Sequence, residues 1–485
     1  MKSAIILLPC TLAACTVGPD YSPPKPAVPA NWTEHAATPA EIARTDEQLK
    51  NWWASFNDPT LDRLVAATLG NNLDLKIASQ RLIGARAARV IAASADYPHI
   101  DVGAIASDKQ ESNTVLFPPV EWNRSNYQFY QFGFDATWEI DIFGGIRRAK
   151  QAAEADYDAT IEARRAVLVS LLAELATDYA TLRASQERLS IADRNVAAAR
   201  ASLELTEQSF TRGLGNSLDV AQAQAQLQTA LSAQPPLRAA IGRLTHAISV
   251  LLGQPPGGAL EQELAGSQGK IPSAPNLPVT LPSEVIANRP DIRRAERQFA
   301  AATARIGVAV ADMYPHFSIP LSLTPETSTL SKFFRVSSLA WVVGLSATQH
   351  VYTGGALSAR VQQAQEQAEE ARLEYQQTVL RAFQNVEDGL IDYMTEAERD
   401  VTLKTAAADS EVAFERSTRL YKAGLTDFLN VLVNERAAYA AEDLATKSEL
   451  ESISDAIALY KALGAGWQDI YPVLPAPGPE NRSTR

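Results

Sequence analysis

The residues that most often carry chemistry are sparse in this chain of 485 residues and form no catalytic pattern. The five histidines are scattered, and two of them belong to a repeated Tyr-Pro-His triplet: His35, His99, His246, His316 and His350. There is no His-Glu-x-x-His motif, no glycine-rich phosphate loop and no Gly-x-Ser-x-Gly motif. Gly213-Leu214-Gly215 lies between predicted helices and lacks the strand that a dinucleotide site requires. The sequence therefore predicts no enzyme, no catalytic residue, no metal site and no cofactor.

The N-terminus predicts a different chemistry, which is lipidation. Residues 1–14 combine Lys2, a short apolar run and small residues, which is typical of an export signal. Leu12-Ala13-Ala14-Cys15 resembles a bacterial lipobox, in which the cysteine becomes the lipid-bearing first residue. By resemblance to lipoprotein sorting rules, Thr16 in the next position favours the outer membrane. A plain signal peptide with an incidental cysteine is the alternative.

The overall charge narrows the possible partners. The formal net charge of −12 argues against a nucleic-acid binder, which would carry a basic stripe. Beyond the signal, the sequence contains no apolar stretch of the kind that a membrane helix needs. A membrane function must therefore come from the lipid or from β-strands.

The sequence contains the same block twice. Four short motifs recur in the same order: Tyr97-Pro98-His99 as Tyr314-Pro315-His316, Gly144-Gly145 as Gly354-Gly355, Gly213-Leu214 as Gly424-Leu425, and Leu252-Gly253 as Leu463-Gly464. A repeat this long implies two copies of a large supersecondary block rather than a solenoid. We predict a lipid-anchored extended segment (15–57), a first repeat (58–253), an equatorial linker (254–282), a second repeat (283–464) and a C-terminal tail (465–485).

Each repeat is predicted to contain a helix followed by a β-hairpin, at residues 99–142 and 316–351. Apolar and polar residues alternate there, as from Tyr130 to Ile140, over the length typical of transmembrane β-strands. A soluble, half-buried sheet would alternate in the same way. Four strands cannot close a barrel in lipid, where every edge must be paired. Several chains must therefore pool their strands: a dimer would supply eight strands and a trimer twelve.

A long helix pair follows each hairpin, at residues 145–252 and 356–463. Apolar residues recur at strict sevens, which predicts coiled-coil-like packing: Ile161, Leu168, Leu175, Leu182, Leu189, Val196, Leu203 and Phe210. In the second copy only Asp400 interrupts this series. Gly213 and Gly424 suit helix ends, and Asn216 or Ser217, and Thr426 or Asp427, can cap the returning helices.

At this point the chain resembles the outer membrane factors, which are the exit ducts of tripartite efflux pumps and type I secretion systems. Within that family it is similar to the lipoprotein branch associated with resistance-nodulation-division pumps. The resemblance covers nearly the whole mature chain. It rests on both glycine turns and on two longer motifs: Trp52-Trp53-x-x-Phe56-x-Asp58-Pro59-x-Leu61 and Asn288-Arg289-Pro290-Asp291-Ile292-Arg293-Arg294-Ala295-Glu296.

The resemblance implies a mainly α fold with a membrane β-barrel. It implies a homotrimeric duct with a 12-stranded barrel, four strands per chain, on a long periplasmic α-helical barrel. Such a duct passively conducts drugs or other toxic compounds from an inner-membrane resistance-nodulation-division pump and a periplasmic adaptor (a membrane fusion protein) across the outer membrane. A lipid-anchored periplasmic coiled-coil scaffold or adaptor without a channel is the alternative, but it leaves the four strands unexplained. Drug, metal and metabolite efflux all remain open.

The resemblance also implies two sites at the helix turns. Family members carry inward acidic residues after the second glycine turn, and the matching positions here are Asn430 and Val433, while a basic residue of some members is replaced by Thr426. We therefore predict a gate with weak cation attraction. Its predicted residues are Phe428, Leu429, Asn430, Val433 and Asp219. For Phe428 and Leu429, packing between the helices is the alternative. The predicted adaptor-binding tips are Arg212, Gly213, Leu214, Ala423, Gly424 and Leu425.

Overall fold

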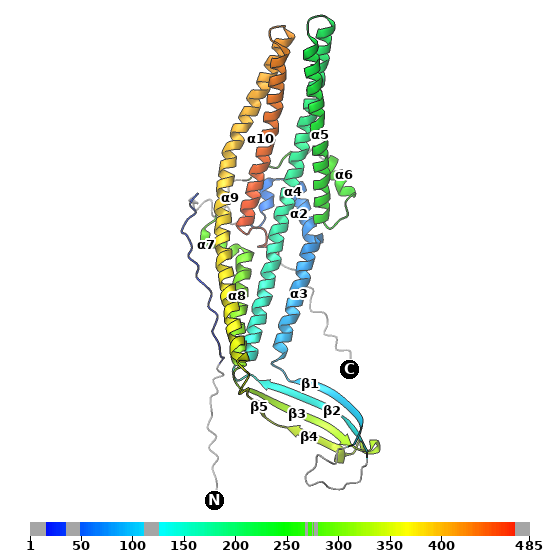
Figure 1. The fold of residues 1–485 in the computed structure, drawn as a ribbon, viewed down its shortest axis with the longest axis vertical. Helices are drawn as coiled ribbons and strands as arrows, with labels where there is room; N and C mark the ends of the chain where they lie inside the picture. The colour runs from blue at the N-terminus through cyan, green and yellow to red at the C-terminus, as the bar shows by residue number, and fades with distance from the viewer. Residues whose placement is uncertain are drawn as a thin grey trace. The chain divides into compact units, whose positions relative to one another are not determined.

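The computed structural model describes residues 16–34, 49–110, 126–266, 270–273, 275 and 280–470 (Figure 1). The predicted signal at 1–14, the predicted lipidation site Cys15 and tail residues 471–485 lie outside these ranges. The helices and strands follow in chain order: η1 (Trp52–Phe56), α2 (Pro59–Asn71), α3 (Leu73–Ser94), β1 (His99–Lys109), β2 (Tyr127–Ile140), α4 (Gly145–Thr211), α5 (Ser217–Leu251), α6 (Ala259–Gly266), α7 (Pro282–Asn288), α8 (Pro290–Ala311), β3 (His316–Thr327), η2 (Leu330–Lys332), η3 (Val336–Ser338), β4 (Leu339–Val343), β5 (Ser346–Thr348), α9 (Ala356–Lys422) and α10 (Phe428–Ala462).

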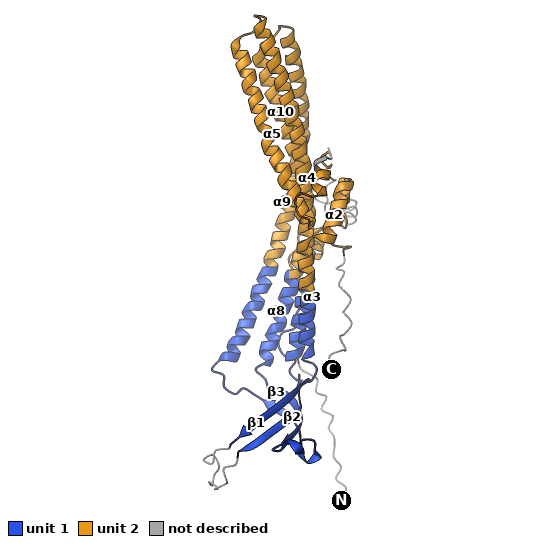
Figure 2. Ribbon diagram, turned by 90° about the vertical axis from the view of Figure 1, so that its right-hand side faces the viewer, with its two compact units in different colours: residues 1–25, 83–160, 295–375 blue, residues 26–82, 161–294, 376–485 orange. Residues whose placement is uncertain are grey.

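The chain forms two compact units (Figure 2). Unit 1 consists of Met1–Lys25, Ile83–Thr160 and Ala295–Tyr375, and it contains the sheet. Unit 2 consists of Pro26–Leu82, Ile161–Arg294 and Gln376–Arg485, and it contains both helix turns. Among the described residues, no helix is both long and apolar enough to cross a membrane.

The sheet of unit 1 is an antiparallel meander in the order β1-β2-β3-β4, with β5 also paired to β3. The predicted fourth strand is divided into β4 and β5, and between them Gly344 still donates its N–H to the Pro320 carbonyl at 3.1 Å. Alternating side chains place apolar residues on one face, and many of them are exposed, including Ile100, Val102 and Trp138. Successive side chains of a pleated strand point to opposite faces of the sheet, which explains why apolar and polar residues alternate in the sequence of these strands.

The extended N-terminal segment of unit 1 is bound to helices α4 and α8. The buried guanidinium of Arg148 donates to the carbonyls of Val17 and Gly18, at 3.0 and 3.1 Å. A Cβ on Gly18 would lie only 2.4 Å from the Cα of Gly307, so the two backbones can touch only because both residues are glycine. The segment is thus held by backbone contacts that the sequence pattern did not reveal.

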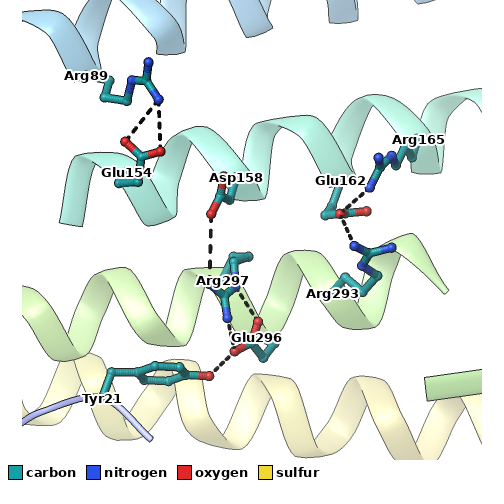
Figure 3. Close-up of polar contacts among 9 residues, drawn as sticks. All are labelled: Tyr21, Arg89, Glu154, Asp158, Glu162, Arg165, Arg293, Glu296 and Arg297. Carbon is teal, nitrogen blue, oxygen red and sulfur yellow. Dashed lines mark hydrogen bonds and ion pairs between the residues drawn. The ribbon is translucent and has the colours of Figure 1, made fainter. Parts of the chain in front are cut away.

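Charged pairs join the helices within each unit (Figure 3). In unit 1 the Tyr21 hydroxyl donates to Glu296, and Glu296 is hydrogen-bonded by the guanidinium of Arg297. In unit 2 the buried carboxylate of Glu162 pairs with Arg165 at 2.6 Å and with Arg293 at 3.2 Å. In each of these pairs a charged side chain of a helix is provided with a polar partner, which a buried ion requires.

In unit 2 the predicted heptad series forms the core of α4. Leu168, Leu175 and Leu182 are completely buried, and in the second copy Val379 and Val386 are nearly so. Burial along the series falls toward the turn, where Phe210 is exposed.

The helical segment that opens each repeat is divided in two, which the sequence pattern did not predict. The first breaks at Asn72, whose side-chain amide donates to the Leu251 carbonyl at 2.8 Å. The second breaks at Arg289, whose guanidinium donates to the Ala462 carbonyl at 2.9 Å. In both copies, therefore, the break provides a side chain that caps the end of the returning helix.

The Leu-Gly motifs lie at these same junctions. Gly253 and Gly464 have φ of +68° and +74°, which side-chain-bearing residues rarely adopt. A Cβ on Gly253 would lie 2.6 Å from the Asn71 carbonyl oxygen, and one on Gly464 would lie 3.0 Å from that of Asn288. The repeated glycines therefore permit both the helix end and the close backbone approach. The predicted linker contains the short helix α6.

Candidate functional site at the helix turns

The two helix turns of unit 2 have the same backbone geometry. Gly213 and Gly424 have φ of +71° and +70°, and a Cβ on either would meet no atom of the described residues within 4 Å. Each turn closes with the two hydrogen bonds of a Schellman motif: Gly213 N to Phe210 O (3.0 Å), Leu214 N to Ser209 O (2.9 Å), Gly424 N to Tyr421 O (2.9 Å) and Leu425 N to Leu420 O (2.9 Å). Leu214 and Leu425 are then left 82 % and 73 % exposed.

The caps of the returning helices differ between the copies. Asn216 caps α5, because its side-chain oxygen accepts the N–H of Asp219 at 2.9 Å. Asp427 precedes α10 without a side-chain cap. Instead, the side-chain amide of Asn430 donates a hydrogen bond to the Thr426 hydroxyl, four residues earlier, at 2.9 Å. The second turn is therefore held through Asn430 itself.

Phe428, one of the predicted gate residues, is buried in the structure. Its side chain is only 2 % exposed and packs with Ala223 of α5 and with Val431 and Leu432 of α10. Partly buried Leu203, Phe414 and Tyr421 complete the cluster. Phe428 therefore packs in a core to which all four long helices contribute, next to the exposed gate residues Leu429 and Asn430.

The other predicted gate residues remain accessible. Leu429 and Val433 are 55 % and 56 % exposed, and Asn430 is also exposed. Their spacing of three and four residues places them on one side of α10. Asp219, on α5, is partly exposed. Next to the turn, these three exposed positions of α10 thus present one amide and two apolar side chains, and none of them is a carboxylate.

Two neighbouring residues of α10 join the copies just behind the turns. Arg436 donates from Nε to Gln226 Oε1 of α5 at 2.7 Å. Glu435 is completely buried and accepts a hydrogen bond from the Ser202 hydroxyl of α4 at 3.0 Å. Burial raises the pKa of Glu435, against the lowering effects of Ser202 and Arg436. These four residues were missed from the sequence, where more than two hundred positions separate the partners.

The cluster borders a cavity of about 310 Å³ between α4, α9 and α10. Its walls are mainly apolar, with Ala201, Leu205 and Phe414 among them, while Lys422 and Glu204 also line it. The cavity reaches Ser202 and Phe428, so it adjoins both the buried Glu435 contact and the core cluster behind the turns.

Farther from the turns, four carboxylates gather between α9 and α10. Burial, followed by the charges of Glu451, Asp392 and Glu396, raises the pKa of Asp455 to about 7. Within the described part of the chain, no three His, Cys, Asp or Glu side chains are grouped so that they could hold a metal ion. The geometry therefore provides helix turns with exposed apolar tips, a weakly polar face and contacts between the two copies.

Known proteins are similar to this chain over most of its length. The family described as "Outer membrane efflux protein" matches residues 64–254 and 281–465. Nodulation protein T of Rhizobium leguminosarum bv. trifolii is 28 % identical over 459 residues, covering 95 % of this chain and 96 % of that protein. The solvent efflux pump outer membrane protein SrpC of Pseudomonas putida is 31 % identical over 470 residues, covering 94 % of this chain and 96 % of that protein.

A solved structure of the outer-membrane channel OprN superposes with a TM-score of 0.86 at 36 % identity, covering 94 % of this chain and 100 % of that one. The matched family consists of transport components rather than enzymes. Sequence, fold and helix turns agree: the chain belongs to the outer membrane efflux protein family and is an outer membrane channel component of an efflux system, extending into the periplasm.

Proposed function

We propose that the chain works as a lipid-anchored homotrimer that passively conducts solutes received from a periplasmic adaptor and an inner-membrane resistance-nodulation-division pump. The observation that carries this proposal is the sheet of unit 1, whose β1 and β4–β5 edges are unpaired among the described residues. Open edges with an apolar face are not stable in lipid, so closure requires strands from other copies. Three chains would contribute twelve strands to one barrel.

The repeats supply the domain organisation of this proposal. We assign the helical duct and barrel strands to the repeats 58–253 and 283–464, with 254–282 between them. The two matched family segments, 64–254 and 281–465, support the same division. Cys15 would become the first residue after removal of the signal, and its lipid would anchor that end of the chain in the membrane. Membrane fractionation and mass spectrometry of the N-terminal peptide would test this, and an unmodified Cys15 would contradict the anchor.

The helix turns are the proposed docking points for the adaptor. Leu214 and Leu425 are the most exposed apolar side chains of their turns, while the glycines provide the backbone geometry. Leu214→Asp and Leu425→Asp should therefore leave the trimer intact and impair export. Leu444→Asp, on the partly exposed side of α10 away from the turns, is the matched control. Full export by both turn variants would contradict docking at these residues.

Export itself is tested in a strain that lacks its own outer membrane channels. Co-expression of this chain with a compatible adaptor and pump should restore resistance to toxic organic compounds. The rival scaffold function predicts a peripheral protein that neither conducts ions nor restores resistance. The upstream pump selects the solute in this proposal, so no substrate pocket is required in the duct.

A further inference from the structure

The two hairpins of the sheet have identical strand registers. His99 lies opposite Thr137, and its counterpart His316 lies opposite Thr348. Farther along, Ala104 lies opposite Phe132, and the equivalent pair is Leu321 and Val343. Adding 217 to each β1 residue number and 211 to each β2 residue number converts the pairs of the first hairpin into the pairs of the second. β1 is therefore equivalent to β3, and β2 is equivalent to the line formed by β4 and β5.

The pairing of β2 with β3 joins the first hairpin to the second. Ile140 lies opposite Phe317, Ala136 opposite Leu321, and Phe134 opposite Leu323, so paired residue numbers add to 457. Because β4–β5 repeats β2 and β1 repeats β3, the same interface can form again between the two open edges. It requires the β4–β5 edge of one chain and the β1 edge of another.

We propose that the β4–β5 edge pairs with β1 of a second copy in the register set by this duplication, so that paired residue numbers add to 451. The proposal rests on the trimeric channel proposed above and adds its residue contacts. The predicted pairs are Val351 with Ile100, His350 with Asp101, Thr348 with Gly103, Ala347 with Ala104, Leu345 with Ala106, and Gly344 with Ser107 of the second copy. Such a head-to-tail interface closes into a ring when its rotation permits.

An otherwise unexplained glycine supports this register. In the internal interface, a Cβ on Gly133 would lie 2.6 Å from the Leu323 carbonyl oxygen and from the Cα of Thr324. Gly133 is therefore needed for close approach of the strands. Its counterpart is Gly344, where an added Cβ would meet, among the described residues, only a Pro320 side-chain atom at 3.9 Å. Nothing in the described part of a single chain therefore requires a glycine at this position.

The proposed register supplies the missing neighbour. It places Ser107 of the second copy opposite Gly344, and Ser107 is the counterpart of Thr324. The Ser107 hydroxyl is shielded and has no hydrogen-bond partner among the described residues. A glycine would thus lie opposite a hydroxyl-bearing residue at two interfaces: the one between β2 and β3 within a chain and the proposed one between two copies.

The two faces of the sheet also match in this register. Leu345 and Ala347 lie opposite Ala106 and Ala104, so apolar residues meet on one face. On the other face His350 lies opposite Asp101, which can accept a hydrogen bond from the imidazole. A slip by one residue would place the apolar side chains opposite the polar face. A slip by two residues would keep the faces but separate His350 from Asp101.

Cross-linking of the full-length protein in membranes tests the register. Ala104→Cys is combined in turn with Leu345→Cys, Ala347→Cys and Gln349→Cys, each set accompanied by its single-cysteine variants. Directly opposite Cα atoms are about 4.5–5.5 Å apart, within disulfide reach, whereas diagonal ones are about 7–8 Å apart. Mild oxidation should give covalent dimers and trimers from the Ala104–Ala347 combination, about tenfold more than from either neighbour.

Preferential cross-linking through Leu345 or Gln349 would overturn the register but leave the trimeric channel standing. Failure of all three combinations in a protein that still runs as a trimer would also overturn it. Absence of both trimers and conductance would contradict the proposed function itself. Independently, Gly344→Ala should lower trimer yield, whereas Gly103→Ala should not, because the counterpart of Gly103 is the bulkier Pro320. Equal trimer yields from these two variants would overturn the Gly344 contact.

Discussion

Arg436 of α10 donates from Nε to the side-chain oxygen of Gln226 on α5 at 2.7 Å, joining the returning helices of the two repeats directly behind their turns. The Gln226 side chain is buried, so removing its charged partner leaves an amide oxygen unpaired. This contact holds the second-copy turn, with its exposed Leu429, Asn430 and Val433, against the first-copy turn. It is the most direct restraint that the structure provides on the proposed gate.

We predict that Arg436→Ala loosens the gate. Because the guanidinium is partly in solvent, the loss should be about 1 kcal/mol, enough to shift an open–closed equilibrium about fivefold. Open probability in planar bilayers measures the effect. Arg243→Ala, at an exposed position of α5 and with no ion pair among the residues that the structure describes, is the control. Unchanged gating in Arg436→Ala would rule out this contact as a restraint.

The charge of the gate can be altered independently of its packing. Asn430→Asp and Val433→Asp add carboxylates at exposed positions, so the ratio of cation to anion permeability should rise. Reversal potentials in a salt gradient measure this ratio. Gln224→Asp, on an exposed position of α5, should have a smaller effect. If the permeability ratio of the α10 variants stays at the wild-type value, these residues do not line the conducting path.

Asp455 predicts a pH-dependent stability. Burial and the charges of Glu451, Asp392 and Glu396 raise its pKa to about 7, whereas an unfolded Asp titrates near 4. A raised pKa in the folded state means that stability is fully present below about pH 4 and falls as the pH rises toward 7. With solvent screening discounted, the loss should be on the order of 1–2 kcal/mol.

Replacing Asp455 by Asn should therefore raise the melting temperature at pH 8 and change it little at pH 4. Asp409→Asn, at an exposed position of α9, serves as the control. Equal shifts at both pH values would show that the effect comes from packing rather than from ionisation.

The glycines at the repeat junctions should be among the least replaceable residues. Gly253→Ala and Gly464→Ala combine positive φ with a contact at or below 3.0 Å, so each should cost more than about 2 kcal/mol. Gly242→Ala, in the middle of α5 with open space around it, should instead stabilise by about 0.5–1 kcal/mol. Thermal melts of the purified trimers compare the three variants, and a neutral Gly253→Ala would contradict the junction geometry.

What could be predicted from the sequence was set by local chemistry. The two glycine turns and the Asn216 cap follow from residues adjacent in the chain, and the heptads of α4 follow from a repeated spacing. The breaks at Asn72 and Arg289 depend on capping the ends of α5 and α10, about 180 residues away in each case. No local pattern shows such partners.

The gate illustrates the same limit. Phe428 and Leu429 are adjacent and both apolar, yet one is buried and the other exposed. The difference arises because Ala223 of the other repeat provides a small surface against which Phe428 packs. Helical spacing alone separates the two residues by face but does not say which face meets the other repeat.

We propose that this chain assembles into an ion-conducting channel whose entrance lies at the helix turns. Single-channel recording of the purified full-length protein in planar bilayers tests it most directly, with wild type and Arg436→Ala measured side by side. We predict discrete conductance steps from both proteins and more frequent or larger openings from Arg436→Ala. A protein that inserts and forms trimers but gives no conductance in either form would contradict the account.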